Sequence, residues 1–316
     1  MMKRILKILG IVLAAIACLV LALLIIPIAE VDLSAPVSGS GDWMSRLPDD
    51  ISLADIAIPG THDSGTAVCE LGFITKCQFS PIAKQLSDGY RYLDVRLMAE
   101  GDEMRFMHGF TSCKTSVFGG NLTLSSVLSD CYSFLREHPT ETIIFCVKNE
   151  YGGASAEDFS SLFSEYVNKS PEMWLLTGSL PTLGHARGKL VLLRRYGDGS
   201  YPGVEFDWPG QGGGNDGKSF ELCNKNGFTL AVQDRYEYDI DEKWAAFTDA
   251  LDAKADLTVN FLSTKGSFVQ GHPFFFASNL NPRLSGADLQ GWTIVDFGTA
   301  EIARTIYERN FILIPD

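Results

Sequence analysis

Two histidines, an arginine and an aspartate lie at the ends of short apolar runs in the first third of the chain. His62 and Asp63 follow one run, Arg96 lies within the next, and His108 closes a third. Histidine can give or take a proton near neutral pH, and arginine offers a permanent positive charge. A base, an acid and a fixed cation are the groups that cleavage of a phosphodiester requires. The sequence therefore predicts phosphodiester chemistry at one site.

Eight short apolar runs must position these side chains. Most are too continuous to be strands with one solvated face, which predicts strands buried on both faces. Helical patterns separate several of them, and strands that alternate with helices indicate a parallel sheet. We therefore predict an α/β fold, a TIM-type (β/α)8 barrel, irregular where the gap between Leu97 and Met104 leaves no room for a helix. The predicted strands are Leu53–Ile58, Arg91–Leu97, Met104–His108, Thr142–Lys148, Lys189–Arg195, Thr229–Gln233, Leu257–Leu262 and Trp292–Phe297. The predicted helices are Leu124–His138, Ala156–Val167, Glu242–Ala255 and Ala300–Asn310.

Charged side chains follow nearly every predicted strand. In a barrel, the carboxyl ends of the parallel strands open on one face, where barrel enzymes carry their active sites. A single ionisable residue after a strand is usually only solvated, but a charge at seven of the eight strand ends is hard to explain in that way. We therefore predict a functional site on this face. Its candidate residues are His62, Asp63, Asp94, Arg96, His108, Lys148, Glu150, Arg195, Asp234, Tyr236 and Asp296.

From Trp43 to the C-terminus the chain resembles the X-type catalytic domain of bacterial phosphatidylinositol-specific phospholipases C. The resemblance implies a distorted barrel and a phospholipase C activity. The resemblance rests on several segments that match in order and spacing. The segments are Pro59-Gly60-Thr61-His62-Asp63-Ser64, Leu93-Asp94-Val95-Arg96, Met107-His108-Gly109, Arg187-Gly188-Lys189-Leu190-Val191-Leu192-Leu193, Val232-Gln233-Asp234-Arg235-Tyr236 and Val259-Asn260-Phe261-Leu262-Ser263.

The resemblance implies a role for each of five residues. His62 would be the general base that removes the proton of the inositol 2-hydroxyl, and Asp296 would fix its tautomer. Arg96 would bind the non-bridging phosphate oxygens. His108, assisted by Asp63, would protonate the departing diacylglycerol oxygen. The products would be diacylglycerol and a cyclic inositol phosphate.

The resemblance also implies how the head group is held and that no metal or other cofactor is needed. Arg96 stands where the calcium-dependent relatives hold a metal beside the phosphate, which favours a metal-independent enzyme. Tyr236 would stack on the sugar ring. The implied substrate-binding residues are Lys148, Glu150, Arg195, Asp234, Tyr236 and, beside Arg96, Asp94.

The N-terminus is predicted to be a separate element. Lys3, Arg4 and Lys7 precede an uncharged apolar run, Ile8–Ala29, of about the length that spans a bilayer. We predict a signal anchor or transmembrane helix over residues 1–30, a linker over 31–42 and the catalytic barrel over 43–316. The basic end would lie inside and the catalytic domain outside. A cleaved signal peptide, with a secreted enzyme, is the alternative.

In an oxidising space, Cys69 and Cys77 make the first candidate disulfide, because they flank one loop. Cys113 with Cys131 is the second candidate. Cys146 lies inside an apolar run and is predicted to be a buried free thiol.

The net charge of −13 argues against nucleic acid as a partner and against electrostatic docking on anionic lipid. Contact with phosphatidylinositol membranes, or with membranes that carry glycosyl-phosphatidylinositol anchors, would then rest on apolar side chains. Phe73, Ile74 and Phe268 are the predicted rim residues, because they lie in loops after predicted strands. We expect a monomer.

Two other functions remain open from the sequence. A non-catalytic barrel could bind inositol lipids or anchored glycans, although His62, Arg96, His108 and Asp296 are all present. A glycerophosphodiesterase or sphingomyelinase D type of barrel would need a metal held by several carboxylates near the first strands. The paired glutamates of such a site are missing from this chain.

Overall fold

The computed structural model describes residues 2–29, 35–197, 202–206, 208, 218–225, 227–266 and 271–312, with the backbone alone for 21–29. The helices are α1 (Met2–Ala29), α2 (Gly72–Thr75), α3 (Ile82–Ser87), α4 (Leu124–Glu137), α5 (Ala156–Val167), α6 (Leu183–Ala186), α7 (Ile240–Leu251), α8 (Pro273–Leu280), α9 (Ala300–Tyr307) and α10 (Arg309–Ile312). Short 3₁₀ helices are η1 (Ser40–Arg46), η2 (Leu53–Asp55), η3 (Pro171–Met173) and η4 (Asn281–Gly286). The strands are β1 (Ile58–Thr61), β2 (Tyr92–Glu100), β3 (Glu103–His108), β4 (Thr111–Ser112), β5 (Ile143–Asn149), β6 (Trp174–Leu175), β7 (Leu190–Arg194), β8 (Val204–Glu205), β9 (Glu221–Lys225), β10 (Phe228–Gln233), β11 (Leu257–Phe261) and β12 (Trp292–Val295).

The strands form one mostly parallel sheet in the order β6-β7-β5-β2-β1-β12-β11-β10-β9, so the predicted α/β class is confirmed. The sheet is curled, as contacts between side chains from its two ends show. The rings of Phe206 and Phe228 lie 5.8 Å apart, and Arg195 Nη2 lies 3.7 Å from Asp234 Oδ2. Within the part of the chain that the structure describes, no backbone ladder joins β7 or β8 to β9 or β10. A closed barrel is therefore not established.

Two of the predicted strands differ from the observed ones. Leu53–Ile58 is wrong as a strand, because Leu53–Asp55 is η2 and β1 begins only at Ile58. The Ser52 hydroxyl accepts a hydrogen bond from the Ala54 amide at 3.2 Å, and such local bonds compete with a sheet ladder. Met104–His108 is a strand, but it is antiparallel to β2 and not a parallel barrel strand. The connection from β2 to β3 is too short for a parallel crossover and allows only a hairpin.

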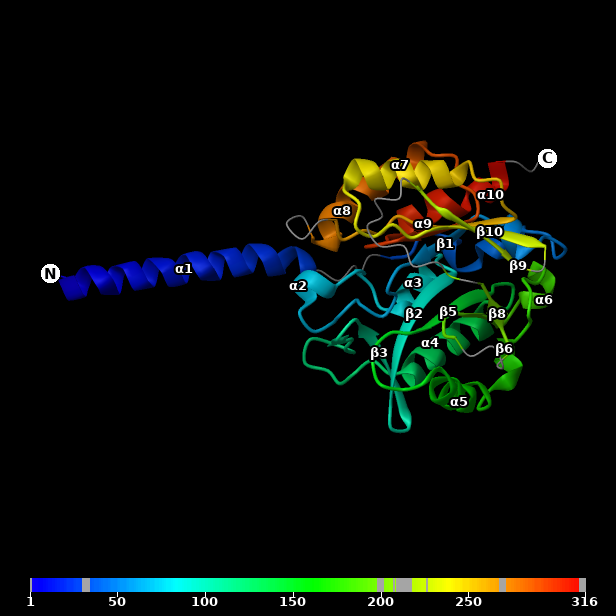
Figure 1. Cartoon of the computed structure of the whole chain (residues 1–316), viewed down its shortest axis with the longest axis horizontal. Coiled ribbons are helices and arrows are strands. Elements are labelled where there is room, and N and C mark those ends of the chain that lie inside the picture. The colour runs from blue at the N-terminus through cyan, green and yellow to red at the C-terminus, as the bar shows by residue number, and fades with distance from the viewer. Residues whose placement is uncertain are drawn as a thin grey trace.

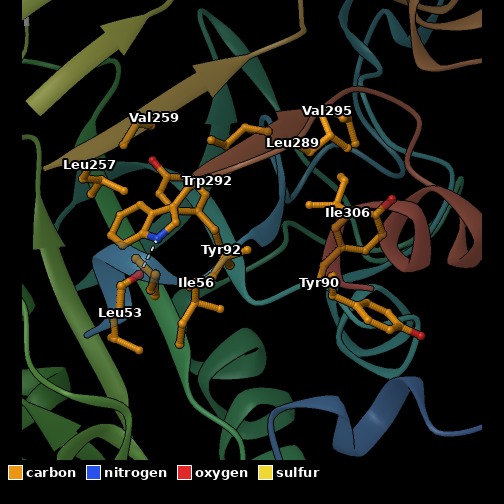
Figure 2. Close-up of a cluster of buried hydrophobic side chains, with 14 of the residues drawn as sticks. Leu53, Ile56, Tyr90, Tyr92, Leu257, Val259, Leu289, Trp292, Val295 and Ile306 are labelled. Carbon is orange, nitrogen blue, oxygen red and sulfur yellow. Dashed lines mark hydrogen bonds between the residues drawn. The ribbon is translucent and has the colours of Figure 1, made fainter. Parts of the chain in front are cut away.

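The interior of the curled sheet is a packed apolar core. Trp292 of β12 is fully buried, and its Nε1 donates a hydrogen bond to the backbone oxygen of Leu53 at 3.0 Å. Figure 2 shows its indole ring among Leu53, Ile56, Tyr92 and Leu257. This contact explains why η2 closes the amino end of the interior.

Alternation along β2 decides which side chains reach the interior. Tyr92 belongs to the interior cluster, whereas Leu93 and Val95 belong to the cluster that packs beneath α4 and α5. Because the side chains of a strand alternate between its two faces, Asp94 and Arg96 point to the interior at the carboxyl end of β2.

A buried ion pair lies at the opposite end of β2, just before its first residue. Arg91 Nη2 lies 2.9 Å from Glu141 Oε2, and neither side chain is exposed. The remaining guanidinium donors of Arg91 bind backbone oxygens, including those of Ser40 and Gly41. The chain therefore already contacts the sheet at Ser40, inside the segment predicted as a linker.

Helix α1 projects away from the rest of the molecule (Figure 1). Its side chains are exposed as far as Val20, the last one that the structure describes. Lys3, Arg4 and Lys7 occupy its start. Among the described residues, no helix is long and apolar enough to span a bilayer. The structure thus does not support the predicted transmembrane anchor.

Candidate active site

The parallel register brings His62 beside Asp296. His62 follows β1, Asp296 follows β12, and these neighbouring strands pair as far as Thr61 and Val295. His62 Nδ1 lies 2.8 Å from Asp296 Oδ1, and His62 Nε2 lies 2.8 Å from Arg96 Nη2. Because arginine only donates, Nε2 accepts this bond and the ring proton is assigned to Nδ1, where it is donated to Asp296.

Burial sets the protonation of this pair. It lowers the pKa of His62 well below the usual histidine value, and the neighbouring charge of Arg96 lowers it further. The ring is therefore neutral at neutral pH, with the lone pair of Nε2 facing the guanidinium. Burial also raises the pKa of Asp296, as does the carboxyl of Asp63.

Arg96 is held by three carboxylates. Its Nε lies 3.1 Å from Asp63 Oδ1 and its Nη2 lies 3.0 Å from Asp94 Oδ2. Its Nη1 lies 3.4 Å from Glu150 Oε1. Burial alone would raise the pKa of Asp94, but Arg96 and Arg195 hold it well below its usual range. These three carboxylates thus hold the Arg96 guanidinium next to His62.

His108 reaches the site along the hairpin and not from the end of a parallel strand. Its Nδ1 lies 2.6 Å from the backbone oxygen of Thr75, so this nitrogen carries a proton. Its Nε2 lies 3.6 Å from Asp63 Oδ2. Protonation of Nε2 would therefore place an imidazolium beside a carboxylate that is almost fully buried.

The backbone turns sharply after both members of the His62–Asp296 pair. Asp63 has φ 44° and Phe297 has φ 48°, values that residues other than glycine rarely adopt. Such conformations cost of order 1–3 kcal/mol and persist where the surrounding structure fixes them. Gln78 contributes to this, because its side-chain amide donates to the backbone oxygens of His62 at 2.7 Å and Val295 at 2.9 Å. Nothing in the sequence pattern marked Gln78.

A cavity of about 630 Å³ opens above these groups, within the usual size of a small-molecule site. Arg195 Nη1 lies 3.3 Å from Asp94 Oδ1, and its guanidinium stacks 4.0 Å above the Trp208 ring. Lys148 pairs with Glu150. No pattern in the sequence marks Trp208. The charged and aromatic residues that line the cavity are His62, Arg96, His108, Lys148, Glu150, Arg195, Trp208, Asp234, Tyr236, Lys265 and Asp296.

Among the residues that the structure describes, three groups of side chains could offer metal ligands. They are His62 with Cys77 and Asp296, Asp63 with Cys77 and His108, and His62 with Asp63 and Asp94. The third group is already bridged by Arg96, whose guanidinium donates to or contacts each of its members. A cation there would have to displace the Arg96 guanidinium, whose side chain is 12% exposed.

The predicted rim residues are placed only in part. Ile74 lies in α2 and lines the cavity, and Phe73 beside it is 42% exposed. Phe268 lies outside the described residues. Phe110 and Phe118, which were not among the predicted rim residues, are also exposed.

The predicted disulfide between Cys69 and Cys77 is not formed in this structure, in which both thiols are free. Thr75 separates them: its hydroxyl lies 3.1 Å from Cys69 Sγ, and its backbone oxygen lies 3.6 Å from Cys77 Sγ. The second candidate, Cys113 with Cys131, is not formed either.

A buried lysine supports the loop that carries Asp234. Lys243 of α7 is unexposed, and its Nζ donates to Gln233 Oε1 at 2.8 Å and to the Arg235 backbone oxygen at 3.0 Å. Burial lowers the pKa of Lys243 to about 7. Because lysine in the unfolded chain titrates near 10.4, the unfolded state binds more protons between these values.

Raising the pH from about 7 to about 10 should therefore increase the contribution of Lys243 to the free energy of unfolding. The measurement is urea unfolding of the wild type and of Lys243→Met across this range. The difference between the two should shift in favour of the wild type as the pH rises. A difference that stays constant would show that Lys243 remains charged in the folded protein.

The chain is similar in sequence and in structure to known phospholipases C. Residues 60–196 match the family described as "Phosphatidylinositol-specific phospholipase C, X domain". A 1-phosphatidylinositol phosphodiesterase of Staphylococcus aureus (strain Newman) is 33% identical over 281 residues, which cover 81% of this chain and 88% of that protein. The protein of the same name from Listeria monocytogenes is 32% identical over 161 residues, or 48% of this chain and 47% of the relative. A solved phosphatidylinositol-specific phospholipase C of S. aureus superposes with a TM-score of 0.69 at 26% identity, over 84% of this chain and 97% of its own.

Proposed function

The chain belongs to the phosphatidylinositol-specific phospholipase C family, and we propose from this premise that it cleaves the bond between glycerol and phosphate in phosphatidylinositol. The inositol 2-hydroxyl attacks the phosphorus, and the products are diacylglycerol and inositol 1,2-cyclic phosphate. The observation that carries the proposal is the neutral His62, hydrogen-bonded to Asp296 on one side and facing Arg96 on the other.

In the first half of the reaction, His62 Nε2 takes the proton of the attacking hydroxyl. Asp296 accepts the Nδ1 proton at 2.8 Å and stabilises the imidazolium as it forms. Arg96 moves its contact from Nε2 to the non-bridging phosphate oxygens, where negative charge grows. The low pKa of His62 in the free enzyme keeps the base unprotonated until the hydroxyl arrives.

In the second half, the protonated His108 gives its Nε2 proton to the glycerol oxygen. Asp63 stabilises the charged ring beforehand, at 3.6 Å from Nε2. The same carboxylate contacts Arg96, so it couples the acid to the phosphate-binding group. Both bond-making and bond-breaking oxygens thus meet a histidine backed by a buried carboxylate.

Polar side chains that line the cavity would bind the inositol head group. Lys148, Arg195 and Asp234 offer charged partners for the inositol hydroxyls, with Asp94 and Glu150 holding the cations in place. Tyr236, which is 41% exposed, stacks on the sugar ring. The reaction as written needs no metal, because Arg96 supplies the charge beside the phosphate.

The protein would meet its substrate at a membrane surface. Phe73 and Ile74 of α2 lie beside the cavity and would enter the lipid interface, so that a chain of net charge −13 approaches lipid through apolar contacts. Glycosyl-phosphatidylinositol anchors, which carry the same inositol phosphate, are a second substrate class. We propose residues 43–316 as the catalytic domain, a monomer with an incompletely closed barrel.

For location we propose secretion after removal of an N-terminal signal, because basic residues precede an apolar run. Recovery of the domain in the medium with a new N-terminus near Glu30 would support secretion. Retention of the intact N-terminus on cells would contradict it.

Cleavage of phosphatidylinositol vesicles by the purified chain tests the activity, with phosphatidylcholine vesicles as the control. We expect inositol 1,2-cyclic phosphate, identified by phosphorus NMR, at a rate that a metal chelator leaves unchanged. Loss of activity with the chelator would show that a cation acts beside the phosphate. A folded chain that binds but does not cleave these vesicles would favour the alternative, a non-catalytic lipid-binding barrel.

A further inference from the structure

Cys69 and Cys113 lie directly opposite each other on two antiparallel segments, although they are far apart in the sequence. The amide after Cys69 donates to the oxygen before Cys113 at 3.0 Å, and the amide after Cys113 donates to the oxygen before Cys69 at 2.8 Å. The two cysteines do not bond to each other through their own amides. This pattern identifies a non-hydrogen-bonded cross-strand pair.

Such a pair has the geometry that a disulfide needs. In non-hydrogen-bonded pairs the Cα atoms are about 4.5 Å apart and the side chains lie on the same face. Disulfides occur at Cα separations of about 4.4–6.8 Å. We propose that Cys69 and Cys113, whose thiols are free in this structure, form a disulfide when the chain meets a thiol oxidant.

The other cysteines near this pair are less suitable partners. Thr75 lies between Cys69 and Cys77, and the Cys77 thiol is buried 4.0 Å from His108 Nδ1. Cys131 is fully buried within α4. Cys69 is the partly exposed member of the group, so it is the thiol that an oxidant can reach.

With oxidised glutathione as the oxidant, the reaction takes two exchanges. The Cys69 thiolate attacks one glutathione sulfur and releases one reduced glutathione. The Cys113 thiolate then attacks the Cys69 sulfur and releases the second. Two protein thiols are oxidised and one glutathione disulfide is reduced. Burial raises the pKa of Cys69 to about 11, so the folded chain should react slowly at neutral pH and faster as the pH rises.

The link would join the two sides of the candidate active site. Cys69 lies between Asp63 and α2, and Cys113 follows β4 of the hairpin that carries His108. A bond between them closes a long loop of the unfolded chain and ties the hairpin to the segment after His62. Typical disulfide stabilisation predicts a rise in Tm of about 5–10 °C.

The test compares the full-length chain after equilibration with oxidised or with reduced glutathione at pH 8.5. Free thiols are blocked with iodoacetamide, the protein is digested, and linked peptides are identified by mass spectrometry. We expect a peptide that joins Cys69 to Cys113 and a Tm that is higher in the oxidised sample. Cys131→Ser is the matched control and should keep both signals.

Cys69→Ser and Cys113→Ser should each lose the linked peptide and the dependence of Tm on the redox buffer. If Cys113→Ser fails to fold, the partly exposed Cys69 still provides the test. A link between Cys69 and Cys77, or full alkylation of Cys69 and Cys113 after oxidation, would overturn the proposal. Because no readout is enzymatic, the result is independent of the proposed function.

Discussion

Replacing His62 by alanine should lower kcat/KM for phosphatidylinositol cleavage by roughly 10²–10⁴-fold, the usual contribution of a positioned base. The change removes both ring nitrogens: Nδ1, which lies 2.8 Å from Asp296 Oδ1, and Nε2, which lies 2.8 Å from Arg96 Nη2. Asp296→Asn should have a loss of similar order, because an amide in place of the acceptor disfavours the Nδ1–H tautomer. The double variant should be little worse than either single one, since the two residues act as a unit.

A pH profile provides a second readout of the same pair. Because His62 must be unprotonated and its pKa is lowered, the acid limb of kcat/KM should lie below the ordinary histidine value of about 6.5. The matched control is His138→Ala, since His138 Nδ1 also lies 2.7 Å from a carboxylate, Asp42, but at an exposed site. Activity of His62→Ala within tenfold of the wild type would show that another group is the base.

Changing Arg96 to lysine should cost roughly 10²–10³-fold in kcat, the loss seen when one preorganised donor to a developing negative charge is removed. Lysine keeps the charge, but its single ammonium cannot contact Asp63, Asp94 and Glu150 together while reaching the phosphate. The measurement is steady-state cleavage of phosphatidylinositol vesicles, with circular dichroism to verify folding.

Arg91→Lys is the matched control for this variant. Arg91 precedes the same strand and is also bound to a carboxylate, Glu141, but at the opposite end of the sheet. We expect it to lower the free energy of unfolding and to leave kcat of the folded protein unchanged. Equal losses of kcat in the two variants would mean that Arg96 acts only through folding.

The part of the site that could be predicted from the sequence depends on neighbouring parallel strands. Alternation of strands and helices fixes where the carboxyl ends meet, so His62, Arg96 and Asp296 could be predicted to converge. Arg96 is an even number of residues from Tyr92, so both side chains lie on the same face of β2. That this face is the interior one follows only from the buried cluster to which Tyr92 belongs.

The hairpin and the cysteines show what the sequence leaves undetermined. An apolar run such as Met104–His108 has the same composition in a parallel and in an antiparallel strand, so only the short connection could have indicated β3's direction. Cysteine spacing favours partners that are near in sequence, but Cys69 lies opposite Cys113 because two loops pair. Trp208 and Gln78 act through tertiary contacts that have no periodic signal.

Among the described residues, the two sides of the site are held together in different ways. On the side of β1, β2 and β12, continuous ladders fix the positions of His62, Arg96 and Asp296 relative to one another. Between Arg195 and Asp234, the described residues are joined by an ion contact of 3.7 Å and not by paired strands. Side chains add to that contact: Lys225 Nζ lies 3.3 Å from Glu205 Oε2, and the Phe206 and Phe228 rings lie 5.8 Å apart. Backbone pairing thus sets the distances among the groups that would move protons, while side-chain contacts hold the wall that would face the inositol hydroxyls.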